Sequence, residues 1–428
     1  MISLSALLVA IALFLLAMGM ASFVVMLKGC LVVREMVRRT PAMDLTLLLK
    51  SPLVPAVSVV AVLPDASLQS REFARRLLDL QFGNLEVVVA LNGRSEADLS
   101  IWIQEFRLIP SARLDDPLPE GRGVVRGLYE SPEPLRLLVV DVDAKRRSSN
   151  AALQAGVEAA SSPVIALIDP ECDFDAPLLL NLICPLLEDP KHTAAVCGTM
   201  PPPPGLTGLT AYFGALESLR SWLARCAAFA GWDLLLPVPG AAMLVRRDVI
   251  QSAGGLRGGP MELFLDLHAL VRRDKNLRIA FVADAVSYPR NPRTWADLLR
   301  RAAKDQAQIG RALRRPGRGG IWGIGWGLPA LFLVRWVKPL LETAALVAVG
   351  AGLMTGRMRP ALAVLVLLAT AGTGMLVSMA AVALRELAAF HGSDPATLAA
   401  RFFAAIPENL GYRQVRNLWL IFGFWQSP

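Results

Sequence analysis

The segment Ala166–Pro177 reads ALIDPECDFDAP and places a short apolar run directly before a group of acidic residues. The apolar run, from Ile165 to Ile168, is typical of a buried strand, and Asp169 and Glu171 follow at its carboxyl end. In an open α/β sheet, ligands bind outside the carboxyl ends of the strands. The segment therefore predicts either a ligand site that binds a hard metal ion through oxygen or an acidic turn that begins a helix.

Before this segment, short apolar runs alternate with stretches of helical periodicity. The runs VSVVAV, LEVVVAL and LRLLVVDVD begin at Val57, Leu85 and Leu135. Between the first two, LQSREFARRLLDLQ repeats its apolar residues every three or four positions, as an amphipathic helix does. This alternation predicts an α/β fold with a mainly parallel sheet flanked by helices.

The two ends of the chain are much more apolar than its middle. Residues 3–26 form an uncharged run of membrane-spanning length, and basic residues follow between Lys28 and Arg39. This order favours a retained N-terminal transmembrane helix over a cleaved signal peptide, and it places the next domain in the cytoplasm. Residues 339–354 and 360–384 predict two further transmembrane helices, whereas 321–339, rich in Trp and basic residues, predicts an interfacial helix.

Composition limits the classes of function. Of 428 residues, 54% are hydrophobic and 19% are charged, which is too apolar for an ordinary soluble protein. The net charge is +8, and the basic residues cluster beside apolar segments, which favours an anionic membrane face as partner and no nucleic acid. The five scattered cysteines suit reduced thiols, and only three histidines are present, so a metal here would be a hard cation. We therefore expect a transmembrane anchor at 1–28, an α/β domain at 50–315 and a membrane region at 321–428.

The order of these segments resembles a membrane-bound family 2 glycosyltransferase of GT-A fold, similar to bacterial polysaccharide synthases. The resemblance runs from about residue 50 to the C-terminus, and several segments in the family's order carry it. They are VSVVAVLPDAS, LDLQFGNLEVVVALNGRS, NAALQAGVEAASSPVIALIDPE, PGAAMLVRRDVIQSAGG, FLDLHALVRRDKNLRIAFVADAVSY, PRTWADLL and PENLGYRQ.

The resemblance implies a nucleotide-sugar site at the ends of the first strands. In the family, residues there hold the base and ribose, which implies this role for Asp65 and Asn92. A DxD pair binds a divalent metal on the donor diphosphate, which implies that Asp169 and Glu171 bind Mg²⁺ or Mn²⁺ and the nucleotide sugar.

The resemblance also implies a general base, which the family takes from a Glu-Asp pair. The corresponding residues here are Leu265 and Asp266, so Asp266 is the expected base. Glu262, four residues earlier, is the reserve candidate, since both carboxylates share a face if this stretch is helical. From the residues alone, Asp266 is equally explained as a helix cap or a structural partner of Arg272 or Arg273.

This chain departs from the family's catalytic motifs at most positions. Asp65-Ala66 stands where the family has Asn-Glu, and Asn92 stands where it has the Asp of DGS. RSSNAALQ at 147–154 replaces GGKADALN, and RAAKD at 301–305 replaces QRxRW. These motifs are degenerate, which leaves two classes of function open.

The first is an inverting membrane glycosyltransferase, which moves a sugar from a nucleotide sugar, with a UDP-sugar as the expected donor, to a lipid or glycan acceptor at the cytoplasmic leaflet of the inner membrane. The second is a pseudoenzyme that acts as the partner or scaffold of an active glycosyltransferase in polysaccharide biosynthesis.

Overall fold

The computed structural model describes residues 4–39, 54–92, 96–111, 124–132, 135–143, 149–203, 205–238, 240–256, 259–314, 325–356, 358–388 and 394–426. The chain forms two compact units. Unit 1 comprises residues 1–39, 201–238 and 291–428, and unit 2 comprises 40–200 and 239–290. The chain therefore leaves unit 2 after Met200 and returns to it at Pro239.

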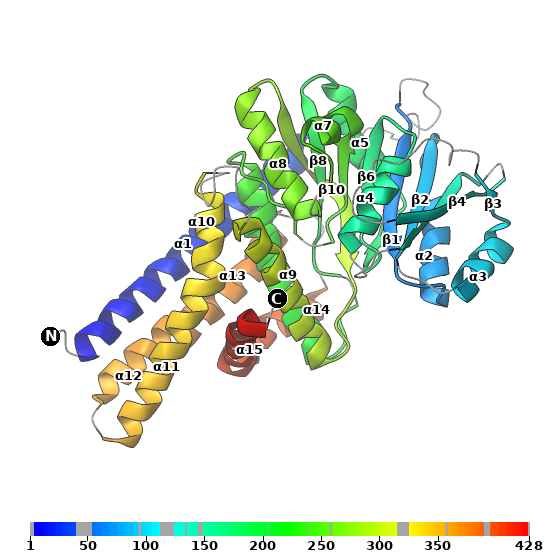
Figure 1. The fold of residues 1–428 in the computed structure, drawn as a ribbon. Helices are drawn as coiled ribbons and strands as arrows, with labels where there is room; N and C mark the ends of the chain where they lie inside the picture. Colours follow the sequence, from blue (N-terminus) through cyan, green and yellow to red (C-terminus); the bar gives the residue numbers. More distant parts are fainter. Residues whose placement is uncertain are drawn as a thin grey trace. The chain divides into compact units, whose positions relative to one another are not determined.

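Unit 2 is built on a ten-stranded sheet (Figure 1). Its strand order is β3-β4-β5-β2-β1-β6-β9-β8-β10-β7. The strands are β1 Val57–Leu63, β2 Leu85–Asn92, β3 Ile109–Pro110, β4 Val124–Glu130, β5 Leu137–Asp143, β6 Val164–Leu167, β7 Cys172–Phe174, β8 Thr193–Thr199, β9 Met243–Arg246 and β10 Arg278–Pro289. Its helices are α2 Leu68–Leu78, α3 Glu96–Phe106, α4 Ser149–Ala159, α5 Leu178–Glu188, α7 Arg247–Ser252 and α8 Pro260–Arg273.

The sheet is mixed, so the prediction of a mainly parallel sheet was wrong in that respect. Strands β5, β2, β1 and β6 are parallel neighbours, and β8 is parallel to β10. Strand β9, however, lies antiparallel between β6 and β8, and β4 lies antiparallel to β5. The physical reason is connectivity: β9 is reached after the excursion through residues 201–238 of unit 1 and not through the helical crossover that makes consecutive strands parallel.

The apolar runs seen in the sequence form the core of unit 2. The side chains of Val57, Val59 and Val87 are fully buried, as expected for central strands covered on both faces. Helix α4 packs very closely on β1, since a Cβ at Gly156 would lie 2.7 Å from Cγ1 of Val60. These strands provide a rigid frame, and the residues that follow their carboxyl ends are fixed by it.

The regular secondary structure of unit 1 is helical throughout the part of the chain described. It contains α1 Leu4–Arg39, α6 Leu209–Ser221, α9 Trp295–Arg314, α10 Gly327–Phe332, α11 Lys338–Met354, α12 Pro360–Leu367, α13 Thr373–Ala388, α14 Pro395–Pro407 and α15 Arg413–Gln426. Four π-helical segments join or extend these helices, namely η3 Trp222–Ala228, η5 Leu333–Val337, η6 Leu368–Gly372 and η7 Glu408–Tyr412.

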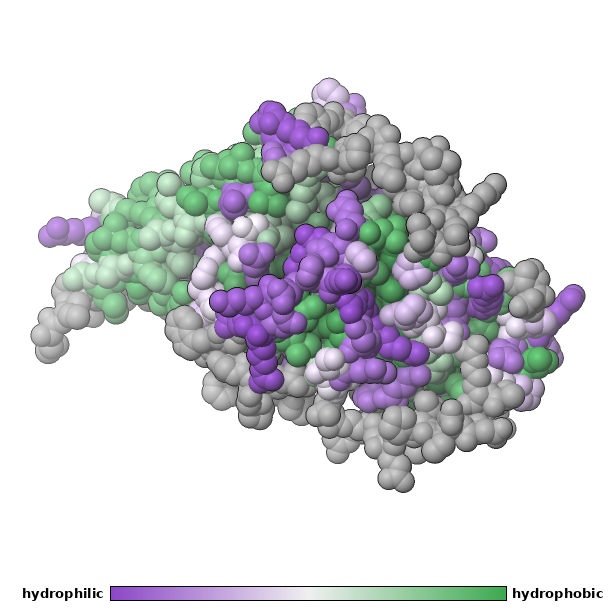
Figure 2. All heavy atoms as spheres, turned by 90° about the horizontal axis from the view of Figure 1, so that it is seen from above, coloured by the Kyte–Doolittle hydropathy of each residue, from purple (hydrophilic) through white to green (hydrophobic). Residues whose placement is uncertain are grey.

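Three helices are long and apolar enough to cross a membrane: Ser5–Arg38, Gly327–Met354 and Pro360–Ala388. They pack on one another through Leu8, Leu15 and neighbouring small residues. Much of their outer surface is hydrophobic and exposed, and it forms the green surface at the left of Figure 2. From Gly327 on, the segment expected to form a separate interfacial helix continues without a break into the span ending at Met354, because η5 keeps the backbone helical past Trp336. Residues 321–324 of that segment lie outside the described residues.

Candidate functional site

Three of the predicted site residues follow the carboxyl ends of adjacent strands of unit 2. Asn92 is the last residue of β2, and Asp65 and Asp169 each follow the end of β1 or β6 by two residues. The order β2-β1-β6 makes these strands neighbours, and all three are parallel. Their carboxyl ends therefore meet at one edge of the sheet, which is the edge where ligands bind in such folds.

Asp65 forms hydrogen bonds at the start of helix α2. Its Oδ1 accepts hydrogen bonds from the backbone N–H of Ser67 at 3.1 Å and from Oγ of Ser70 at 2.8 Å. Partial burial raises the pKa of Asp65, but these hydrogen bonds outweigh burial and hold the pKa below its ordinary value. The carboxylate therefore stabilises the turn before α2, and Oδ2 is the oxygen left to face a ligand.

Asn92 is buried, with 8% of its surface exposed, and its Oδ1 has no hydrogen-bond partner among the described residues. A buried amide oxygen without a partner destabilises the folded state, since it has lost its hydrogen bonds to water and has formed no other hydrogen bond. It is thus an acceptor available to a ligand that carries N–H or O–H groups, such as a nucleobase or ribose.

Asp169 and Glu171 form a tight acidic turn. The backbone N–H of Glu171 donates to Oδ1 of Asp169 at 2.8 Å, and the N–H of Cys172 donates to the Asp169 carbonyl at 3.0 Å. The turn leads into strand β7 and not into a helix, so the alternative of a helix-initiating turn is wrong. Helix α5 begins later, at Leu178, and no side chain caps it.

The acidic turn offers only part of a metal site. Among the described residues, no group of three or more His, Cys, Asp or Glu side chains is placed to hold an ion. The donor set of this turn is nevertheless all oxygen, and Glu171 is exposed. Two hard carboxylates of this kind fit Mg²⁺ or Mn²⁺ when substrate phosphates and water complete the coordination, as is usual for Mg²⁺.

The two candidate bases lie on helix α8. Glu262 and Asp266 are 5% and 2% exposed and are separated by one helical turn. Oε2 of Glu262 and Oδ1 of Asn150 both lie against Gly259, where a Cβ would come within 3.2 and 3.0 Å of them. Asn150 is in the first turn of α4, which follows the carboxyl end of β5, so Glu262 lies toward the same edge of the sheet. Asp266 lies one turn further from that edge along α8.

Sequence reasoning missed other charged residues at this edge. Asp143 ends β5, next to β2, and its carboxylate forms an ion pair with Arg126 at 2.8 Å. Asp173, two residues after Glu171, pairs with Arg76 at 2.5 Å, and the Arg76 guanidinium lies over the Phe174 ring. Asp143 was detectable, because it ends a buried run in the same way as Asn92 does.

Unit 1 contains a network of buried charges that was not predicted. Asp305 forms ion pairs with Arg225 at 2.7 Å and with Arg335 at 2.5 Å. Burial raises the pKa of Asp305, but Arg335 and Arg225 outweigh it and hold the pKa below its ordinary value. The segment that stands in place of QRxRW thus contributes a structural carboxylate to unit 1.

The network continues through other helices of unit 1. Glu217 pairs with Arg416 at 2.8 Å, and Glu408 pairs with Arg220 at 2.5 Å. Glu342 of α11 pairs with Arg413 of α15 and accepts a hydrogen bond from Nδ2 of Asn417 at 2.9 Å. The charges connect a candidate membrane span with helices outside the spans.

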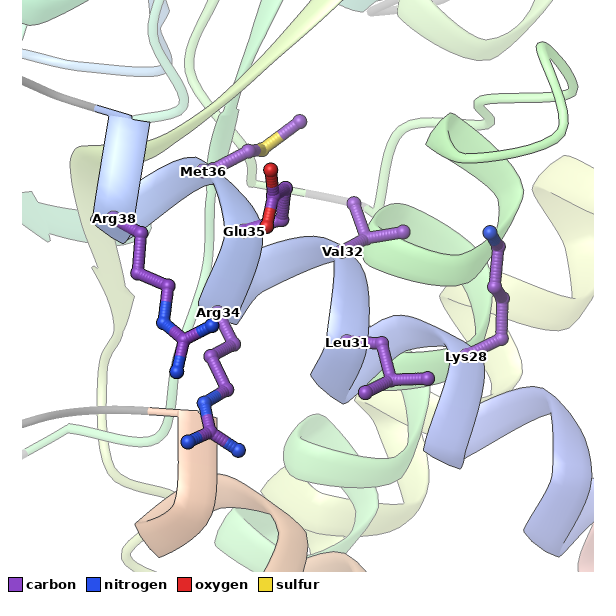
Figure 3. A pocket seen from close by; sticks show the side chains of 7 residues that line it. All are labelled: Lys28, Leu31, Val32, Arg34, Glu35, Met36 and Arg38. Atoms are coloured by element: carbon purple, nitrogen blue, oxygen red, sulfur yellow. The ribbon is translucent and has the colours of Figure 1, made fainter.

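The end of helix α1 is basic. Figure 3 shows Lys28, Arg34 and Arg38 around a hollow of about 530 Å³ that Glu35 and Met36 also line. Arg34 and Arg38 are exposed, lie four residues apart and extend to the same side of the helix. This charge lies directly after the apolar part of the candidate span, where basic residues mark the cytoplasmic side of a membrane.

No protein-family model and no curated protein matches this chain. Among solved structures it is similar to the mannosyltransferase PcManGT from Pyrobaculum calidifontis, determined in complex with GDP-Man and Mn²⁺. The identity is 18%, the TM-score is 0.55, and the match covers 95% of this chain and 99% of that one. It is also similar to glucosyl-3-phosphoglycerate synthase from Mycobacterium tuberculosis, determined with Mn²⁺, UDP and phosphoglyceric acid. That match has 18% identity and a TM-score of 0.37, and it covers 66% of this chain and 86% of that one.

The likeness to the mannosyltransferase shows the fold. The chain has the GT-A-like fold of a glycosyltransferase, with a mixed sheet, flanking helices and three apolar helices of spanning length. The fold predicted from the sequence is confirmed at this level.

Proposed function

We propose that this protein is a membrane glycosyltransferase of family 2 type that transfers a sugar from a nucleotide-sugar donor to a lipid or glycan acceptor at the cytoplasmic leaflet, with inversion. The main support is the convergence of Asp65, Asn92 and Asp169 at one carboxyl edge of a sheet with a glycosyltransferase fold. The mannosyltransferase to which the chain is similar was determined with GDP-Man and Mn²⁺, which supports a nucleotide sugar as donor. We propose a UDP-sugar here.

In this proposal, Asn92 and Asp65 hold the nucleoside. The free amide oxygen of Asn92 accepts a hydrogen bond from the base or ribose, and Asp65 offers its second carboxylate oxygen. Neither residue needs to move, because Asn92 ends the buried strand β2 and Asp65 closely follows the buried strand β1. Their contribution is binding and orientation of the donor.

Asp169 and Glu171 would hold Mg²⁺ or Mn²⁺ against the donor diphosphate. When bound, such a cation offsets the charge that develops on the departing diphosphate. The backbone N–H of Glu171 donates to Oδ1 of Asp169 and holds this carboxylate in one orientation. Exposed Glu171 supplies the second carboxylate with a longer and more adaptable side chain.

An inverting transfer needs a base that removes the proton of the acceptor hydroxyl while the anomeric carbon is attacked in line. We assign this role to Asp266, with Glu262 as the alternative. Both carboxylates are buried on one face of α8. The position of Glu262 beside Asn150 and Gly259 supports the alternative.

The proposed location is the inner membrane, with unit 2 in the cytoplasm. Three candidate spans and the basic end of α1 support it. We retain the division into an anchor at 1–28, a glycosyltransferase domain at 50–315 and a membrane region at 321–428 as part of this proposal.

A specific observation supports the second function, a catalytically inactive partner of an active glycosyltransferase. Several carboxylates of the region are engaged in structure: Asp65 with α2, Asp143 with Arg126, and Asp173 with Arg76. Asp305, in the segment that replaces QRxRW, is enclosed by two arginines. A scaffold that keeps the fold without turnover would show this pattern.

A measurement of nucleotide binding distinguishes the two proposed functions. UDP and then GDP are titrated by calorimetry into detergent-purified protein, with and without Mn²⁺, and into the variant Asp169→Ala. The glycosyltransferase proposal expects Mn²⁺-dependent binding that Asp169→Ala weakens by at least about 100-fold, since the loss of a group that only supports a metal ligand already costs about 10- to 100-fold.

Asp79→Ala is the matched control, because Asp79 is an exposed carboxylate that follows α2 and precedes β2, at the opposite edge of the sheet. This variant should bind as the wild type does. Absence of binding by either nucleotide to folded wild-type protein would contradict the enzyme proposal and favour the partner.

A further inference from the structure

A cavity of about 250 Å³ lies within unit 1, between α11, η6 and the start of α15. Its volume equals that of about eight water molecules. Glu342, Arg413 and Asn417 are among its polar lining residues, and Val347 and Leu418 are among its apolar ones. The cavity is therefore amphipathic, which is unusual beside a candidate membrane span.

The apolar side of the cavity is open to the surroundings of the helix. Val347 is 65% exposed and Leu418 is 43% exposed, although both are apolar. Val347 lies within the candidate span Gly327–Met354, so the surface around it would face lipid chains in a membrane. A ligand that enters past Val347 must carry an apolar chain.

The polar side of the cavity contains charged groups within a candidate membrane span. Glu342 is 3% exposed, and its carboxylate is held by Arg413 and Asn417. Ionisable groups at membrane depth are costly, and they usually mark a functional site. The pair itself is neutral, so the sign of its surroundings decides which head group is attracted.

Those surroundings are positive. The network contains more guanidinium groups than carboxylates within the described residues, and arginine stays charged in proteins. It comprises Arg220, Arg225, Arg335, Arg413 and Arg416 against Glu217, Asp305, Glu342 and Glu408. An uncompensated positive charge in a low dielectric is stabilised by a bound anion.

We propose that this cavity binds a lipid with an anionic phosphate head group. The phosphate lies at the polar side, near Arg413 and the hydroxyl groups of Thr343 and Thr370, and one acyl chain leaves the cavity past Val347 and Leu418. The bound lipid balances the charge of the network and joins α11 to α15. The inference rests on the membrane location proposed above and does not depend on the donor site.

The test is lipid binding to the full chain. Purified protein is incubated with dioleoylphosphatidylglycerol, and the bound lipid is counted by native mass spectrometry. Val347→Trp fills the mouth of the cavity, and binding should fall by at least about tenfold, since overpacking excludes the chain. Val364→Trp is the matched control: Val364 is also an exposed valine, on the next candidate span, and does not line the cavity.

Two further measurements test which part of the lipid the cavity recognises. Dioleoylglycerol has the same chains without the phosphate and should not compete, and inorganic phosphate at the same concentration should not displace the lipid. Thr343→Val removes a hydroxyl from the polar side without changing the shape, and it should weaken binding about fivefold.

Equal binding to Val347→Trp and Val364→Trp would overturn the proposal, as would effective competition by dioleoylglycerol or by inorganic phosphate. None of these outcomes involves a nucleotide. A negative result for lipid binding therefore does not contradict the glycosyltransferase proposal, and absence of UDP binding does not contradict the lipid proposal.

Discussion

Two site carboxylates of unit 2, Asp65 and Asp169, differ from the buried carboxylates of unit 1 in how far along the chain their hydrogen-bond partners lie. At the carboxyl edge of the sheet in unit 2, Asp65 and Asp169 accept hydrogen bonds from residues two to five positions away. In unit 1, Glu408 pairs with Arg220, 188 residues away, and Glu342 pairs with Arg413, 71 residues away. Local bonds shape turns that can present a ligand site, whereas distant pairs hold helices together. The units can be tested separately because different measurements respond to each.

The largest effect is expected from the distant pairs. Glu408 is 1% exposed and accepts hydrogen bonds from Arg220 and from Oγ of Ser378 at 2.8 Å. Glu408→Ala leaves Arg220 partly buried without its carboxylate, so the free energy of unfolding should fall by about 3–5 kcal/mol. Thermal or denaturant unfolding in detergent measures this loss.

A surface pair in unit 2 provides the control. Asp248 is 62% exposed in its pair with Arg246, and Asp248→Ala should cost less than about 1 kcal/mol. Similar losses in the two variants would mean that the network of unit 1 does not hold its helices together.

Acid should weaken unit 1 through the same network. Burial raises the pKa of Glu217, but Arg416, Arg335 and Arg220 outweigh it, and the pKa lies below the ordinary value of 4.5. The pKa of Asp305 lies below 3.8 for the same kind of reason. A carboxylate with a lowered pKa in the folded state stabilises the fold fully above its unfolded pKa, and this contribution is lost as pH falls through the folded pKa.

The thermal midpoint should therefore be flat from pH 7 to about pH 5 and should fall below about pH 4. Glu217→Gln should have a lower midpoint at pH 7 and a shallower fall in acid, because one titrating group is gone. An identical acid profile in wild type and Glu217→Gln would show that other carboxylates control acid unfolding.

The difference between the units also explains what the sequence could predict. Strand ends and turns follow from neighbouring residues, so VVVALN and IALIDPE were enough to place Asn92 and Asp169 at the edge of a sheet. The mixed direction of β9 was not predictable from alternation, because its connection passes through unit 1.

The network of unit 1 was hidden for a related reason. PENLGYRQ was recognised as a family-like segment, yet its Glu408 and Arg413 pair with residues on α6 and α11. A single sequence carries no signal for such distant pairs. Asp305 lies in the segment that replaces QRxRW, where no role was predicted for it, and its two arginine partners make it structural.

Substitutions of Asp65 test whether a carboxylate with local hydrogen bonds also binds a ligand. Asp65→Ala removes the acceptor for Ser67 and Ser70 at the start of α2, and it should cost about 1 kcal/mol of stability. Asp65→Asn keeps one acceptor oxygen and should recover most of this loss. If Asp65 also contacts the nucleoside, both variants should weaken UDP binding measured by calorimetry, whereas a purely structural role predicts that Asp65→Asn binds UDP as the wild type does.

The smallest effect is expected at Asn92, where the resemblance places an Asp in the family. Asn92→Asp would replace a neutral hydrogen bond to the nucleoside by a charge-assisted one, which is about twice as strong. Burial at 8% exposure opposes the charge, so the net gain should be small, about threefold in the Kd for UDP. Asn92→Ala, which removes the acceptor, should weaken binding by a similar factor.

These two variants decide whether the edge of the sheet retains a binding surface. Opposite shifts in the Kd for UDP would mean that Asn92 faces the nucleoside and that the carboxyl edge still does what its position in the fold predicts. If neither variant changes UDP binding while both remain folded, the free amide oxygen of Asn92 has no ligand. The polar residues of unit 2 would then be structural in the same sense as the ion pairs of unit 1, and the partner function would gain its strongest support.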